Sequence, residues 1–141
     1  MHGDKKLERA HDAGKTAVAI GIGCKRGCSS EAIAALVERA IAAACAGAPA
    51  ALFTHEAKKS EAGLASAAKA LGLPLVFLDG QVLQQASLRA TTSSPRVMAL
   101  FGLPSIAEAA ALAGAGPSSI LLVARMSEGG ASCAIAGNRD P

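Results

Sequence analysis

The residues best suited to chemistry lie close together, where glycines and two cations follow a β-branched run at residues 18–20. Gly21, Gly23 and Gly27 allow the backbone to approach a ligand closely and to adopt positive φ angles. Lys25 and Arg26 add positive charge, and an arginine can hold a carboxylate or phosphate through two parallel bonds. This spacing predicts a strand that ends in a glycine turn suited to an anionic ligand.

A helix is expected to begin directly after this turn. Ser29 or Ser30 can cap its first free N–H groups, and Glu31 places a negative charge in the first turn, where it suits the helix dipole. Free N–H groups at a helix start attract anions. We therefore expect this stretch, including Cys24, to bind a small anion.

The glycine spacing, GxGxxxG, also resembles a loosened dinucleotide-binding fingerprint. The next predicted strand ends near Glu56, roughly where such proteins carry a ribose-binding acid. Against this, Lys25 and Arg26 occupy the turn where the fingerprint needs small residues, and the chain has no Walker-type GK[ST] sequence. A nucleotide-binding α/β domain that uses residues 21–27 is kept as an alternative.

Two further pairs of residues have a structural interpretation beside a chemical one. Ser105 and Glu108 have the S-x-x-E spacing of a capping box at a helix start. Lys58 and Glu61 are three residues apart and could form a surface ion pair. Arg125, near the end of a predicted strand, is either a ligand contact or an exposed edge residue.

Catalytic triads and metal sites find little support. His55 is the only histidine outside the N-terminal segment, and no obvious nucleophile lies beside it. Cys24 and Cys28 have a CxxxC spacing, but no second Cys or His pair follows, so we expect no metal and no cofactor. Cys45 and Cys133 are interpreted as small core residues.

Composition limits the class of protein further. The 141 residues suit one domain, with residues 1–15 as an arm-like tail and residues 16–141 as the folded part. A net charge of +3 and an aromatic share of 2% argue against a nucleic-acid partner. No apolar run is long enough for a membrane span, and the charged N-terminus does not resemble a secretory signal, so a cytoplasmic location is expected.

Strands and helices are predicted to alternate along the chain. Apolar runs predict strands at residues 18–20, 50–54, 75–78, 120–124 and 132–136, the last two joined as a hairpin. Helical spacing predicts helices at residues 33–45, 61–71, 81–86 and 105–113, with Ser60 as a cap of the second, and residues 96–101 suit either helix or strand. The pattern predicts a three-layer α/β/α domain with a mixed, mostly parallel sheet and a C-terminal β-hairpin.

Four stretches together resemble one known family. They are GIGCKRGCSSEAI at residues 21–33, KKSEAGL at 58–64, GLPSIAEAAAL at 102–112, and the closing pair ILLVAR and ASCAIAG at 120–137. In this order they resemble the CobE/CbiG C-terminal domain family of cobalamin (vitamin B12) biosynthesis, over residues 16–137. Two positions depart from the family pattern, because Arg125 stands for a lysine and Glu56 for an aspartate.

The resemblance implies work on a corrin-ring precursor. The larger two-domain relative of the anaerobic route is a cobalt-precorrin-5A hydrolase, which opens a lactone and releases acetaldehyde. A stand-alone domain of this length is similar to CobE of the aerobic route, so the expected role is to bind or act on a tetrapyrrole. Lactone hydrolysis is an alternative, as is a carrier that passes intermediates to other cobalamin-pathway enzymes; the oligomeric state is left open.

The family motifs and the carboxyl-end rule for open α/β sheets together predict the site. Lys58 and Glu108 are the candidates for acid–base catalysis. The expected ligand-binding residues are Gly21, Gly23, Cys24, Lys25, Arg26, Gly27, Ser29, Glu61, Ser94, Gly102, Ser105 and Arg125.

Overall fold

The computed structural model describes residues 17–44 and 48–138, which form one sheet with helices on both faces. The strands are β1 (Ala17–Cys24), β2 (Ala48–His55), β3 (Leu75–Leu78), β4 (Ile120–Glu128) and β5 (Ala131–Gly137), in the order β3-β2-β1-β5-β4. β1, β2 and β3 are parallel, whereas β5 is antiparallel to both β1 and β4. Four strands therefore run in one direction and only β5 is reversed, which confirms the mixed sheet with its C-terminal hairpin.

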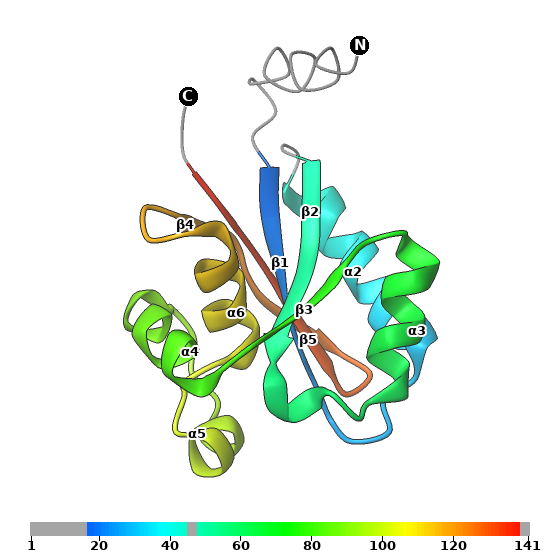
Figure 1. Ribbon diagram of the computed structural model, residues 1–141, viewed down its shortest axis with the longest axis horizontal. Helices are drawn as coiled ribbons and strands as arrows, with labels where there is room; N and C mark the ends of the chain where they lie inside the picture. Colours follow the sequence, from blue (N-terminus) through cyan, green and yellow to red (C-terminus); the bar gives the residue numbers. More distant parts are fainter. Residues whose placement is uncertain (1–16, 45–47, 139–141) are drawn as a thin grey trace.

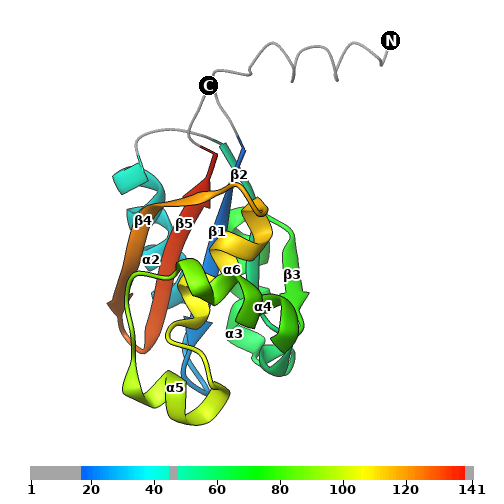
Figure 2. The same cartoon turned by 90° about the vertical axis from the view of Figure 1, so that its left-hand side faces the viewer.

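The helices form two layers. The helices α2 (Ser30–Ala44) and α3 (Ala62–Leu71) cover one face, and α4 (Gly80–Ala86) and α6 (Ile106–Ala115) cover the other. Figure 2 shows α4 and α6 in front of the sheet, with α2 and α3 behind it and α5 (Pro95–Phe101) at one edge. Short 3₁₀ turns occupy Glu56–Lys58 and Ser87–Arg89. The predicted three-layer arrangement is confirmed (Figure 1).

The two faces of the central strands differ in the size of their side chains. On β1, Val18, Ile20 and Ile22 pack in the core with α2 and α3, whereas the alternate residues are alanine and glycine. The small residues let α6 lie close to the sheet. A Cβ atom on Gly21 would overlap the carbonyl oxygen of Ala107, so only glycine fits there.

This packing corrects one prediction. Gly21 and Gly23 lie within β1, which runs four residues beyond the predicted end, and do not form a turn. The prediction was wrong because the alternation of large and small residues continues through the glycines, and α6 covers their face of the strand. Of the glycines at this end of β1, Gly27 has a positive φ of 75° and lies in the turn.

Most other elements match their predictions, and the differences lie at the ends. β2 and both hairpin strands are longer than expected. Residues 96–101, which suited either structure, lie in the helix α5, where Ser94 is the N-cap, its hydroxyl accepts the N–H of Val97, and Pro95 takes the first helical turn. The N-cap of α3 is Glu61, without a side-chain bond, so the prediction of Ser60 was wrong. The predicted tail at residues 1–15 and the helix end at Cys45 lie outside the described residues.

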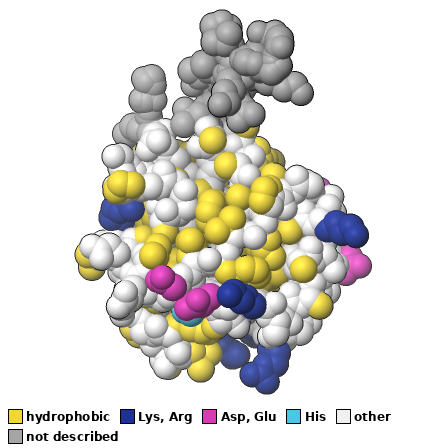
Figure 3. Space-filling view, in the orientation of Figure 1, with side chains coloured by type: hydrophobic (Ala, Val, Ile, Leu, Met, Phe, Trp, Pro, Cys, Tyr) yellow, Lys and Arg dark blue, Asp and Glu magenta, His cyan; other side chains and the backbone are white. Residues whose placement is uncertain are grey.

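No single helix in the described ranges is long and apolar enough to cross a membrane; the bent pair α5 and α6 meets the criteria of length and composition only when counted together. In Figure 3 apolar side chains gather over the edge strand β3, and charged side chains lie below them and at the left and right margins.

Candidate functional site

A pocket of about 410 Å³ opens at the carboxyl end of β1, between the start of α6 and the β4–β5 hairpin. Ligands of open α/β sheets generally bind at this edge. The lining combines hydroxyls, two cations and an apolar wall, contributed by Gly23, Cys24, Lys25, Ser94, Val97, Ser105, Ile106, Ala107, Arg125, Ser127, Glu128, Gly130, Ala131 and Ser132. Six of these, Gly23, Cys24, Lys25, Ser94, Ser105 and Arg125, are among the residues that the sequence predicted.

The start of α6 forms one wall of this pocket. Ser105 is the N-cap, and its hydroxyl accepts the backbone N–H of Glu108 at 3.1 Å. Ile106 and Ala107 follow at the first two helical positions, whose N–H groups have no partner within a helix. The positive end of the helix dipole therefore faces the pocket. The predicted anion-binding helix start was α2, yet α6 is the helix whose first residues line the pocket.

Two cationic side chains line the pocket, one just after β1 and one from β4. Lys25 follows β1, and its backbone N–H donates to the carbonyl of Gly130 at 2.8 Å, which ties it to the hairpin turn. Arg125 comes from β4. The acidic residue in the lining, Glu128, forms an exposed ion pair with Arg39 of α2. The pocket therefore favours an anion.

Glu108 lies beside the pocket and has no exposed surface. Its Oε1 accepts the backbone N–H groups of Thr91 at 2.8 Å and Thr92 at 2.9 Å, and its Oε2 accepts the N–H of Arg125 at 2.9 Å. The Thr91 hydroxyl also lies 3.2 Å from Oε2. An acid–base group has to reach its substrate, and this buried carboxylate does not line the pocket.

The pKa of the Glu108 carboxyl reflects these bonds. Burial acts to raise the pKa, but the backbone N–H groups of Arg125, Thr92 and Thr91 favour the charged form and hold the pKa below its usual value. The predicted capping box is thus half formed: Ser105 caps Glu108, while the Glu108 carboxylate binds two other segments of the chain.

Lys58, the other catalytic candidate, lies in a separate cluster. Its Nζ is 5.5 Å from the ring centroid of Phe101, and the His55 ring packs against the same phenyl group at 5.1 Å. Glu61 accepts the backbone N–H of Gly27 at 2.9 Å, and it forms no salt bridge with Lys58 in the described structure. None of these residues lines the pocket.

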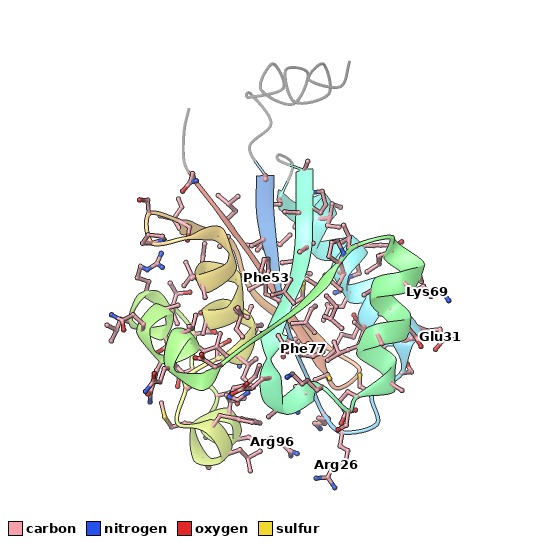
Figure 4. The ribbon with its side chains drawn as sticks, viewed as in Figure 1. Arg26, Glu31, Phe53, Lys69, Phe77 and Arg96 are labelled. Atoms are coloured by element: carbon pink, nitrogen blue, oxygen red, sulfur yellow. The ribbon has the colours of Figure 1, made fainter. Side chains whose placement is uncertain are left out.

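The remaining residues that were predicted to bind a ligand do not line the pocket. Arg26 extends outward from the loop after β1 (Figure 4). Ser29 caps α2, because its hydroxyl accepts the N–H of Ala32 at 3.1 Å. Gly102 ends α5 with a φ of 71°, and Gly21 is covered by α6.

The cysteines described by the structure are free thiols. Burial raises the pKa of Cys24 to about 11 and that of Cys133 to about 12, so both are protonated at neutral pH. Within residues 17–44 and 48–138, no group of three His, Cys, Asp or Glu side chains is placed to hold a metal ion.

Apart from Arg125, sequence reasoning missed the hairpin side of the pocket. Ser127 and Ser132 lie on facing strands, and their hydroxyls are 2.9 Å apart. The available signal was their position on either side of the Glu128–Gly129–Gly130 turn. This turn lies beside the carboxyl end of β1 only because β5 pairs with that strand. That pairing is long-range and was not predicted.

Comparison with known proteins identifies the family. The profile described as Cobalamin synthesis G C-terminus matches residues 18–136. A Protein CobE from Sinorhizobium sp is 33% identical over 120 residues, which cover 84% of this chain and 78% of that protein.

Two solved structures are also similar. One is the crystal structure of CobE, a protein from the cobalamin (vitamin B12) biosynthetic pathway, with a TM-score of 0.80, 37% identity and coverage of 86% of this chain and 89% of that chain. The other is the cobalamin biosynthesis protein chiG from Agrobacterium tumefaciens, with a TM-score of 0.68, 34% identity and coverage of 87% and 99%. The chain therefore belongs to the cobalamin synthesis G C-terminus family, as a CobE/CbiG-like protein of cobalamin biosynthesis.

Proposed function

We propose that this protein binds a corrin-ring intermediate through the pocket at the carboxyl end of β1. The observation that carries the proposal is the convergence of Lys25, Arg125 and the start of α6 on one pocket. Corrin precursors carry acetate and propionate groups around an apolar ring. Arginine, lysine and helix N–H groups are the partners that carboxylates prefer in proteins.

The size of the pocket suggests how such a ligand would bind. Ligand pockets usually have volumes of roughly 300–1,000 Å³, and this one, at about 410 Å³, is near the lower end. A whole macrocycle with its side chains is larger than this. We therefore propose that the pocket takes one carboxylate side chain and the adjoining edge of the ring, with the apolar wall at Val97, Ile106 and Ala131 against the ring carbons.

The other two classes of function are less well supported. A dinucleotide phosphate would need to approach the face of Gly21 that α6 covers. The two candidates for the acid–base work of a lactone hydrolase do not line the pocket, because Glu108 is buried beside it and Lys58 lies over Phe101. Binding without turnover, as in a carrier, fits the geometry best.

The visible absorption spectrum tests this proposal. The protein would be purified after co-expression with the upstream corrin-ring enzymes, and a retained tetrapyrrole band is expected. The double variant Lys25→Ala/Arg125→Ala should lose the band. The matched control Lys59→Ala/Lys69→Ala removes the same charge from exposed positions outside the pocket and should keep it.

Two results would contradict the proposal. They are a colourless wild-type protein and a band that survives in the Lys25→Ala/Arg125→Ala variant. Acetaldehyde released from a bound lactone intermediate would instead favour the hydrolase.

A further inference from the structure

We infer that Glu108 is a positioning residue of this pocket: its buried carboxylate holds a bulge in β4 and the loop at residues 91–92, so that Arg125 and Ser94 face the ligand. This inference rests on the proposed function. It gives Glu108 a role through other residues, in place of contact with the substrate.

The first observation is an irregularity of β4 at Arg125. Val123 lies opposite Ile135 and Met126 lies opposite Cys133, so β4 has two residues where β5 has one. Such a bulge bends the strand and changes the direction of a side chain, and bulges are frequent beside active sites. The N–H of Arg125, one of the two bulged residues, donates to Oε2 of Glu108 at 2.9 Å. The carboxylate thus satisfies the backbone group at the bulge.

The second observation concerns the opposite side of the same carboxylate. Oε1 accepts the N–H groups of Thr91 and Thr92, in the irregular segment that leads to Ser94. The N–H of Ser94 donates to the carbonyl of Pro104 at 2.8 Å, and Ser94 lines the pocket. One side chain on α6 therefore connects two segments, each of which supplies a polar group to the pocket.

The chemistry of the carboxylate explains why glutamate is needed there. An ionised carboxylate only accepts hydrogen bonds, and Glu108 faces three backbone N–H donors from Thr91, Thr92 and Arg125. A glutamine of the same shape would turn an N–H₂ group toward one of these donors and leave it without a partner. The bulge or the loop would then have to move.

A purely stabilising role makes a different prediction, and Arg89 offers a matched control. Arg89 connects a 3₁₀ turn to the other end of α6, through bonds to the carbonyl groups of Ser119 and Gly116. It does not line the pocket. Arg89→Met should therefore lower stability as Glu108→Gln does, without changing the position of Arg125.

The test is calorimetric titration with cobyrinic acid, a corrin whose acetate and propionate groups are free carboxylates. Thermal unfolding first establishes that each variant is folded at 25 °C. Glu108→Gln should bind roughly tenfold more weakly or worse, as expected for an impaired charge-assisted contact. Arg89→Met should bind as the wild type does. In an Arg125→Ala background, Glu108→Gln should have a much smaller further effect, since the glutamate acts largely through Arg125.

The outcomes separate the two proposals. Wild-type protein that does not bind cobyrinic acid contradicts the proposed function. Wild-type binding with unchanged affinity in folded Glu108→Gln overturns the inference alone, as does an equal loss in Arg89→Met. If Glu108→Gln does not fold, Glu108→Asp serves instead: it keeps the charge but is too short to reach both segments, and unchanged affinity in that variant also overturns the inference.

Discussion

Gly21 lies where the backbone of α6 comes closest to the sheet. A Cβ atom at this position would overlap the backbone of Ala107 and Ala111, whereas one at Gly23 would be 3.5 Å from the Cβ of Ile106, an ordinary contact. The sequence does not distinguish the two glycines, but in the structure only Gly23 leaves room for a side chain.

This difference gives a stability prediction. Gly21→Ala should lower the free energy of unfolding by about 1–3 kcal/mol or more, because α6 would have to move away from β1. Gly23→Ala should be neutral or slightly stabilising, because alanine reduces the entropy of the unfolded chain. Urea unfolding of both variants measures the difference. An equal effect would show that α6 does not pack on Gly21 as described.

Glu108 gives a pH prediction at the same scale. Its pKa is lowered in the folded state, so its contribution to stability is present above the pKa of the unfolded chain and is lost as pH falls through the folded pKa. The stability difference between wild type and Glu108→Gln should therefore be largest near pH 7 and decrease below about pH 4.5. Urea unfolding over this pH range measures the stability difference. A difference that stays constant at acidic pH would contradict a charged Glu108 in the folded protein.

The helices and strands could largely be predicted because their signals are local. Ser105 stands where a helix was predicted to begin, and its hydroxyl accepts the N–H of Glu108, three residues on. Ser94 caps α5 in the same way, but the sequence of that helix suited either helix or strand. The third strand was predicted with its correct bounds, because a short apolar run stands between Pro74 and Asp79. Half of the pocket was not predictable, since it depends on the pairing of β5 with β1 and on α6 covering Gly21.

The caps of α6 and α2 give a matched pair of variants. Ser105→Ala and Ser29→Ala each remove a hydroxyl that accepts a helix N–H, so each should cost about 1 kcal/mol of stability. Only Ser105 lines the pocket. We therefore expect Ser105→Ala alone to weaken cobyrinic acid binding, as measured by calorimetry. If both variants bound cobyrinic acid with equal affinity, the start of α6 would not be part of the binding site.

At the scale of the whole molecule, the sheet has two unlike sides. Isoleucine and valine side chains of β1 and β5 face α2 and α3, while alanine and glycine face α6. The large side packs against Ile33, Leu36 and Val37 of α2, and the small side brings the start of α6 close to the strand ends. The pocket therefore lies on the α6 side of the sheet.

The antiparallel pairing of β1 with β5 determines how the domain would respond to a pulling force. Ala19 pairs with Ala136 at one edge of the sheet, and Cys24 pairs with Ala131 at the pocket edge. A load applied at residues 17 and 137 acts on neighbouring strand ends at the same edge (Figure 1). It would break the hydrogen bonds between β1 and β5 one after another, whereas a shearing load would act on all of them at once. Mechanical resistance should therefore be low, and the pocket edge of this strand pair should separate last.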